Sequence, residues 1–317
     1  MKNLYVSASE YYKSIFGQKI YKISLDAGCT CPTRDGTKGT RGCIFCSAAG
    51  SGDFASSGQL SLQEQVKQAK SLVINKIPKN QREQAKFIAY FQSFTNTYGN
   101  QEALLATFNQ AIAEPDIVGI TIATRPDCLN ASFIKEIAQL RPPQYPEHQA
   151  FHISIELGFQ TSKEQSVEFI RRGYENQCYV QAVEAIHTLA PQIHVVTHII
   201  FGLPEETTED MLNTVQYVLA SQTDGIKFTV LHILEHTDLA PLWKSGQVKT
   251  LSQEEYFSLL QQALALVQEY TQKTGKPIVI HRLTGDGPKK ILLAPLWTAN
   301  KKKVLNDLKS FLRPALL

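Results

Sequence analysis

Short runs of β-branched and aromatic residues alternate along the chain with longer stretches in which apolar residues recur at helical spacing. Six of these runs predict β-strands, over Ile20–Leu25, Phe87–Phe91, Ile117–Ile122, Phe151–Glu156, His194–Phe201 and Gly225–Leu231. The stretches after them predict helices, over Leu62–Ile74, Gln101–Ala113, Ala131–Leu140, Tyr179–Leu189, Glu206–Ala220 and Gln253–Thr271. Strand–helix units in such a series indicate a parallel sheet joined by right-handed crossovers.

Beyond the last unit the pattern predicts a strand over Pro277–His281 and a helix over Ala299–Leu312. We therefore divide the 317 residues into an N-terminal extension (1–19), an α/β unit (20–273) and a C-terminal extension (274–317). Periodicity leaves two architectures open, a partial barrel and an open doubly wound sheet. In barrels the chemistry lies where strands end and loops begin, so residues after the strands are the first candidates for a site.

Composition narrows the class of protein. Hydrophobic residues make up 43% and charged residues 19% of the chain, which is typical of a globular protein with a large core. No apolar run approaches the roughly 18 residues of a membrane span, and the first residues lack the apolar centre of a signal peptide. We therefore expect a cytoplasmic protein without a membrane partner. A net charge of +3 neither demands nor excludes a nucleic-acid partner.

Four of the six cysteines lie in one glycine-rich segment, between positions 29 and 46. Clustered thiols in a chain without an export signal indicate a metal site or a catalytic site. Eleven residues separate Cys31 from Cys43, and two separate Cys43 from Cys46. Thiolates are the ligands of iron–sulfur clusters, and a loop with three of them leaves one iron open for chemistry.

Other interpretations of these cysteines remain open at this point. A structural zinc site would take Cys29 as its fourth ligand, although the chain has no second CxxC motif. A thioredoxin-type pair at Cys43 and Cys46 would need a helix that begins at Cys43. The isolated Cys128 and Cys178 are expected to be small buried apolar residues.

The run from Asp26 to Phe54, DAGCTCPTRDGTKGTRGCIFCSAAGSGDF, resembles the cluster loop of the YhcC/YtqA-like radical S-adenosylmethionine (SAM) family, a relative of the Elongator catalytic subunit. The resemblance continues through YFQSFTNTYG (90–99), ATRPDCL (123–129), SIELGFQT (154–161), IIFGLPEET (199–207) and RLTGDGPKKILLAPLW (282–297). It implies a partial (β/α)6 TIM-like barrel with a C-terminal extension, and a 4Fe-4S cluster on Cys31, Cys43 and Cys46. Cys29 stands where relatives usually carry an aromatic residue, and the Cys31-Pro32 context favours Cys31 as the ligand.

The resemblance also implies where the cofactor SAM binds. Its contacts are expected at the strand ends, from Gln92, Ser93, Asn96, Thr124, Arg125, Glu156, Gln160, Arg172, Gly202 and Leu203. His232 and Glu235, after the sixth strand, are candidates for contact with the substrate. Each has an ordinary alternative: a helix cap for Ser93 or Asn96, a salt bridge to Asp127 or Glu136 for Arg125, and a helix-surface charge for Arg172.

In this family an electron from the cluster cleaves SAM to a 5'-deoxyadenosyl radical, so a reducing electron donor is an implied partner. The Elongator relationship implies tRNA as substrate, modified on the side chain at carbon 5 of the wobble uridine. Basic residues beside Trp297 suit an RNA surface, although a solvated helix face would also account for them: Lys289, Lys290, Lys301, Lys302 and Lys303. Two alternatives stay open, a radical SAM enzyme for a small molecule and a non-catalytic iron–sulfur sensor.

Overall fold

A curled parallel sheet of eight strands forms the centre of the protein, in the order β1-β9-β7-β6-β5-β4-β3-β2. This computed structural model describes residues 5–50, 58–142, 145 and 149–312, so positions 51–54 of the cysteine motif lie outside it. The strands are β1 (Val6–Ser7), β2 (Ile20–Leu25), β3 (Lys86–Phe91), β4 (Ile117–Thr124), β5 (His152–Gln160), β6 (His194–Phe201), β7 (Gly225–Val230) and β9 (Val279–Arg282). A short antiparallel pair, β8 (Ile233–Leu234) with β10 (Leu292–Ala294), follows the sheet.

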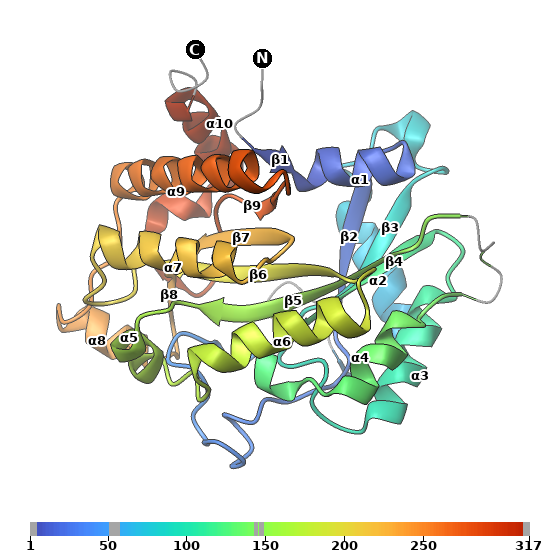
Figure 1. Cartoon of the computed structure of the whole chain (residues 1–317), viewed down its shortest axis with the longest axis horizontal. Helices are drawn as coiled ribbons and strands as arrows, with labels where there is room; N and C mark the ends of the chain where they lie inside the picture. Colours follow the sequence, from blue (N-terminus) through green and yellow to red (C-terminus); the bar gives the residue numbers. More distant parts are fainter. Residues whose placement is uncertain (1–4, 51–57, 143–144, 146–148, 313–317) are drawn as a thin grey trace.

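Helices connect the strands, and most of them pack along one face of the curled sheet (Figure 1). They are α1 (Ala8–Phe16), α2 (Leu62–Ile74), α3 (Gln101–Ile112), α4 (Ala131–Ala138), α5 (Glu164–Phe169), α6 (Asn176–Leu189), α7 (Thr208–Ala220), α8 (Leu239–Lys244), α9 (Gln253–Thr274) and α10 (Lys301–Leu312). The described residues also contain three short 3-10 helices, which are η1 (Lys79–Gln81), η2 (Pro126–Cys128) and η3 (Leu296–Ala299). In the described part of the chain, no helix combines the length and apolar character needed to cross a bilayer.

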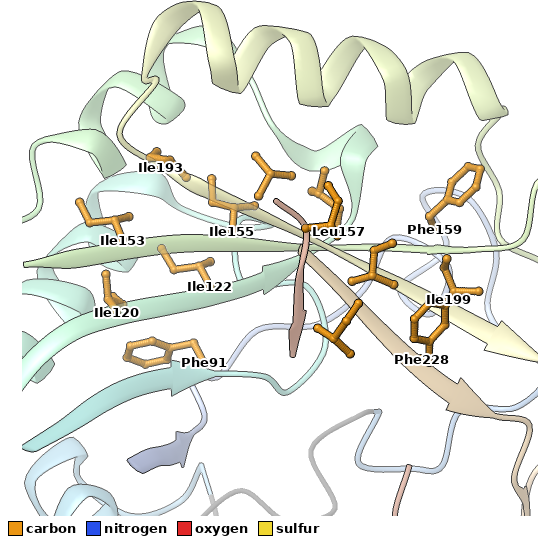
Figure 2. Close-up of a cluster of buried hydrophobic side chains, with 14 of the residues drawn as sticks. Phe91, Ile120, Ile122, Ile153, Ile155, Leu157, Phe159, Ile193, Ile199 and Phe228 are labelled. Atoms are coloured by element: carbon orange, nitrogen blue, oxygen red, sulfur yellow. The ribbon is translucent and has the colours of Figure 1, made fainter. Parts of the chain in front are cut away.

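Alternation along the strands separates a core face from a polar face. Ile153, Ile155 and Leu157 of β5 belong to the buried apolar cluster between sheet and helices, and Figure 2 shows them with the neighbouring strands' apolar side chains. Successive side chains of a strand point to opposite faces of the sheet, so the residues between them, including Glu156, point to the concave face. In β7, Phe228 packs into the core and Lys227 faces the concave side in the same way. The inside of the half-barrel is therefore polar, and this is where a site can form.

The partial-barrel prediction is confirmed, with strand boundaries that differ from the expected ones. Both predicted extensions contribute to the sheet: β9 pairs with β7, and β1 pairs with β9. The fourth predicted strand was placed over Phe151–Glu156, whereas β5 continues to Gln160. Glu156 is therefore in the middle of its strand, and its side chain lies within the half-barrel rather than at its rim.

Candidate active site

One cavity with two lobes opens at the carboxyl ends of the strands. The cysteine lobe is lined by Cys31, Cys43 and Cys46 together with Thr124, Arg125, Glu156, Gln160 and Arg172. The Arg282 lobe is lined by Gln92, Thr229, His232, Arg282 and Asp286. The two lobes adjoin because both are lined by Phe45, Cys46, Gly50, Tyr90, His198 and Ile200. Residues 31 to 46 and residues 282 to 286 thus border a single space.

The cysteine loop folds back on itself, which brings its first and last thirds together. The amide of Gly42 donates to the carbonyl of Thr33 at 2.7 Å, so Cys43 follows directly beside the Cys31 end of the loop. Gly42 has φ of 71°, and a Cβ there would lie 2.8 Å from the Nε of Arg34. Arg34 in turn donates to the Ser47 carbonyl at 2.6 Å and so fixes the chain beyond Cys46. Residues 43–50 form turns and no helix, which removes the structural basis for a thioredoxin-type pair.

The electrostatic setting favours thiolate at Cys43, while the hydrogen bond shared with Cys43 and burial raise the pKa of Cys46 well above its usual value. A hydrogen bond from the Cys46 thiol lowers the pKa of Cys43 to about 7, against the effect of burial. The nearby guanidinium groups of Arg125, Arg34 and Arg171 contribute to this lowering of the pKa. Thiolate is the form that binds metals, so positive charge around the loop suits a thiolate-bound cluster.

Hydroxyl groups approach the sulfur of Cys31. Thr95 Oγ1 donates to Cys31 Sγ at 3.4 Å, and Thr33 Oγ1 shares a hydrogen bond with the same sulfur at 3.2 Å. Hydrogen bonds to ligand sulfurs are among the features that set the potential of an iron–sulfur cluster. Thr95 is a member of the polar run after β3 that was expected near the cofactor, and it also lines the cysteine lobe.

The remaining cysteines have the opposite environment. Burial raises the pKa of Cys29 to about 12, with a contribution from Asp26, and Cys29 does not line either lobe. Burial likewise raises the pKa of Cys128 to about 12. Among the described residues, no group of three or more His, Cys, Asp or Glu is arranged to hold one metal ion. The structure thus distinguishes Cys31 from Cys29 by its place in the cavity.

Arg125 has the salt bridge that the sequence left open as an alternative. Its Nε and Nη2 donate to the two carboxylate oxygens of Asp127 at 2.9 and 2.8 Å, and its guanidinium lies 5.0 Å from the ring centre of Tyr174. Lys38, in the middle of the cysteine loop, donates to Asp127 at 2.6 Å. Asp127 therefore joins the loop to the end of β4, and Arg125 is held in place while it lines the cavity.

Arg172 is a buried structural cation, not a helix-surface charge. Its side chain is 1% exposed and donates to the carbonyls of Phe159 and Thr161 at 2.8 and 2.7 Å and to Asn176 Oδ1 at 2.7 Å. These bonds hold the turn after β5, where Gln160 adopts φ of 67°. Arg172 and Gln160 line the cysteine lobe together.

Glu156 is the centre of a buried ion network. Its Oε1 accepts from Lys22 at 2.9 Å, and its Oε2 forms a very short ion pair with Lys227, which also donates to Tyr90 at 3.1 Å. Burial would raise the pKa of Glu156, but the two lysines outweigh it and hold the pKa well below the usual range. Both carboxylate oxygens are thus engaged by this chain's own cations, and contact between Glu156 and SAM stays a prediction.

The other predicted residues fall into two groups. His232 and Gln92 line the Arg282 lobe, where burial lowers the pKa of His232 to about 4 and keeps its imidazole neutral at pH 7. Five do not line either lobe: Ser93, Asn96, Gly202, Leu203 and Glu235. The Asn96 amide donates to the carbonyls of Phe91 and Ala123, in the last residues of β3 and β4. Leu203 belongs to a buried apolar cluster, and Glu235 is exposed.

Sequence reasoning missed several cavity residues that lie inside strands. Tyr90, His198 and Lys227 line or border the cavity from β3, β6 and β7, and Arg282 ends β9. The sequence did contain a signal for them, a polar residue between two apolar residues of a strand. A lysine between Ile226 and Phe228 would be costly to bury unless one face of the strand is polar.

Comparison with known proteins places the chain in a family. The model of the Radical SAM superfamily matches residues 36–218, and that of the Radical_SAM C-terminal domain matches residues 223–313. The chain belongs to the Radical SAM superfamily. This family works with a 4Fe-4S cluster and S-adenosylmethionine, and the resemblance inferred from the sequence motifs is confirmed.

Relatives in this superfamily differ in how much of the chain they share. The protein YtqA of Bacillus subtilis is 37% identical over 301 residues, covering 95% of this chain and 87% of YtqA. The tRNA uridine(34) acetyltransferase of Methanocaldococcus jannaschii is 23% identical over 163 residues, covering 50% of this chain and 28% of that protein. In fold, the chain is similar to the Elp3 structure of Methanocaldococcus infernus, with a TM-score of 0.62 at 15% identity over 94% of this chain and 63% of that one.

Proposed function

We propose that Cys31, Cys43 and Cys46 hold the 4Fe-4S cluster and that SAM binds beside it in the cysteine lobe. The observation that carries this proposal is the arrangement of thiols: these three line one cavity at the carboxyl ends of the strands. When bound, the cluster would supply the electron that cleaves a carbon–sulfur bond of SAM to give methionine and a 5'-deoxyadenosyl radical. The protein's own contribution is position, exclusion of water and charge.

The residues around the cysteine lobe have distinct tasks in this proposal. Thr33 and Thr95 stabilise charge on the Cys31 sulfur through their hydroxyl groups. Asp127 holds Arg125 through Nε and Nη2, and the other N–H groups of the guanidinium are directed to the carboxylate end of SAM. Gln160 and Thr124 line the same lobe and provide polar contacts for the rest of the cofactor.

We further propose a tRNA substrate, modified at the side chain on carbon 5 of its wobble uridine. A relative that shares half of this chain is named a tRNA uridine(34) acetyltransferase, which supports a role near that nucleotide. The basic residues of the C-terminal region supply a suitable surface. Among the described residues, Lys289, Lys290 and Lys302 are exposed and form no ion pair, so their charges are available to phosphates.

The start of α10 connects this basic surface to the cavity. Lys301 pairs with Asp286 at 2.5 Å, and Asp286 lines the Arg282 lobe. Trp297 has another role: its indole N–H donates to the Leu251 carbonyl at 3.0 Å and its ring packs 5.5 Å from that of Tyr256. In this structure the indole is not free to stack on a base, so the RNA surface consists of the lysines alone.

Nucleoside analysis of tRNA from cells that lack this protein tests the substrate directly. We expect a nucleoside with a modified carbon 5 side chain to disappear or to be replaced by its precursor. The wild-type gene should restore it and the Cys31→Ala variant should not. An unchanged set of tRNA nucleosides would contradict the tRNA proposal.

Two measurements separate the remaining functions. Release of 5'-deoxyadenosine by the anaerobic holoenzyme distinguishes an enzyme from an iron–sulfur sensor, because a sensor releases none. Retention of tRNA at near-physiological salt distinguishes a tRNA enzyme from one that acts on a small molecule.

A further inference from the structure

The last residue of β9 is turned into the cavity by a bulge. Ile280 pairs with Ile226 of β7, but the next pair joins Arg282 to Lys227, so one extra residue, His281, is inserted on β9. Without the bulge Arg282 would share the core side of Ile280; with it, Arg282 stands beside Lys227 on the concave side. Bulges commonly redirect a side chain next to an active site. In Figure 1, β9 lies next to β7 near one edge of the sheet.

Arg282 has no acidic partner there. Within the described part of the chain its guanidinium makes no hydrogen bond and no ion pair, although it is half-buried and lines the cavity. Glu156, the nearby carboxylate, is already engaged by Lys22 and Lys227. The positive charge of Arg282 is therefore not paired with a carboxylate of the described residues. A half-buried cation without a partner is costly unless a ligand supplies the opposite charge.

Polar atoms near Arg282 also lack partners. His198 Nε2, Thr229 Oγ1 and Asp286 Oδ1 are buried and form no hydrogen bond among the described residues, and all three side chains line the Arg282 lobe. The charge of the Asp286 carboxylate is already paired with Lys301 through its other oxygen. Buried polar atoms are rarely left without a partner in folded proteins. The lobe therefore presents an unpaired cation together with further hydrogen-bonding atoms, which is the composition of a binding site for a polar anion.

The wall that carries Arg282 is closely packed. A Cβ at Gly285 would lie 2.7 Å from Thr229 Cγ2 and 2.8 Å from His232 Cε1, and one at Gly287 would lie 2.6 Å from Leu292. Only glycine allows the segment after β9 to pack this closely against His232. The ring of His232 is held from its other end by Thr298, 3.2 Å from Nε2. This explains the glycines of the RLTGDGP motif, which the cluster chemistry leaves without a role.

We propose that Arg282 anchors an anionic group of the substrate, a phosphate or a carboxylate, in the Arg282 lobe. The planar guanidinium binds either group through two parallel N–H···O bonds and so fixes the orientation of the substrate next to the cysteine lobe. This proposal rests on the function proposed above in one respect, that the cavity holds the substrate of a radical SAM enzyme. It does not depend on the substrate being tRNA.

The test uses small oxyanions with the anaerobically reconstituted holoenzyme and SAM present throughout. Inorganic phosphate is titrated in one series and acetate in another, at ionic strength held constant with potassium chloride, and the melting temperature is followed. Wild type should show a saturable rise with at least one anion. Arg282→Gln should need at least about ten-fold more of that anion for half-saturation, because it loses a bidentate charge-assisted pair.

Arg82→Gln is the matched control. Arg82 follows η1 at the amino end of β3, away from the cavity, and donates from Nε to the Ile77 carbonyl. The Arg82→Gln variant should reach half-saturation at the same anion concentration as wild type. Arg282→Lys, which keeps the charge but not the fork, should lie between wild type and Arg282→Gln, and iron content checks that each variant is loaded.

Each outcome decides the proposal. A rise with phosphate alone assigns the lobe to a phosphate group, and a rise with acetate alone assigns it to a carboxylate. The proposal is overturned if neither anion gives a saturable rise in wild type, or if Arg282→Gln and Arg282→Lys both keep the wild-type midpoint. Because this titration contains no nucleic acid, an unchanged set of tRNA nucleosides in cells that lack the protein would count against the tRNA substrate and not against this anion site.

Discussion

Replacing Glu156 by glutamine tests the buried ion network that crosses the half-barrel. The side chain of Glu156 is 1% exposed and joins Lys22 of β2 to Lys227 of β7. Glutamine has nearly the same shape and can still hydrogen-bond, but it carries no charge. The substitution therefore leaves two lysines in the interior without a counter-ion.

The expected loss of unfolding free energy is large because the substitution removes only one partner of the buried ion pair. Removing one partner of a buried ion pair typically costs about 3 to 5 kcal/mol of unfolding free energy. At about 2.1 cal/mol/K per residue, the unfolding entropy of this chain is about 0.7 kcal/mol/K, so we expect a fall in melting temperature of about 4 to 8 °C. Replacing Lys227 by methionine in the same variant should recover part of the loss, since one uncompensated cation is then removed.

The pH dependence follows from the direction of the shift. The lysines hold the pKa of Glu156 well below the usual 4.5, so this carboxylate stabilises the fold at every pH above 4.5. The contribution is lost only as pH falls through the lower, folded-state pKa. The difference between wild type and Glu156→Gln should therefore be constant above pH 4.5 and shrink below it.

Melting of the reconstituted protein at one scan rate, under anaerobic conditions, gives the comparison. Glu114→Gln is the control, because Glu114 pairs with Lys70 at 3.3 Å with its side chain 34% exposed, and such surface pairs contribute about 1 kcal/mol or less. If Glu156→Gln melts within the range of Glu114→Gln, the ion network does not stabilise the half-barrel and the reasoning is wrong.

Three further predictions concern the cysteine loop and the basic surface. Asp127→Asn should speed the loss of iron in the presence of a chelator, followed by visible absorbance, because the Lys38 bridge to the loop is weakened; an unchanged rate would show that Asp127 does not hold the loop. In cluster-free protein at pH 7.5, iodoacetamide should modify Cys43 before Cys29, whose pKa values are about 7 and about 12; peptide mass spectrometry would contradict this if Cys29 reacted first. Lys290→Glu with Lys302→Glu should weaken tRNA retention and flatten its salt dependence by about one in log–log slope per lysine that contacts a phosphate; equal binding would remove these residues from the RNA surface.

Much of the fold was accessible from sequence because short runs of β-branched and aromatic residues alternate with stretches in which apolar residues recur at helical spacing. The ends of the strands were harder to predict. Glu156 looked like the end of its strand because its side chain is charged, yet β5 continues to Gln160. The concave face of this half-barrel carries charged side chains within its strands, Glu156 in β5 and Lys227 in β7, so a charged residue there does not terminate a strand.

Site residues were predictable where a motif lies on a loop. They were less predictable where the pairing of distant strands decides which way a side chain points. The cysteine spacing identified the loop, and the structure adds that Cys29 lies outside the cavity. Arg282 was not accessible in this way, since its direction depends on the bulge between β9 and β7, which arises from register and not from local sequence. Partners such as Asp127 for Arg125 were named as alternatives, and only three-dimensional geometry selects among them.

The central claim is that three particular thiols hold the cluster, and single alanine variants of the cysteines test it most directly. After anaerobic reconstitution, Cys31→Ala, Cys43→Ala and Cys46→Ala should lose bound iron and the release of 5'-deoxyadenosine, while Cys29→Ala and Cys128→Ala should keep both. The account is contradicted if Cys29→Ala loses iron while Cys31→Ala retains it, or if the wild-type protein binds zinc in place of an iron–sulfur cluster.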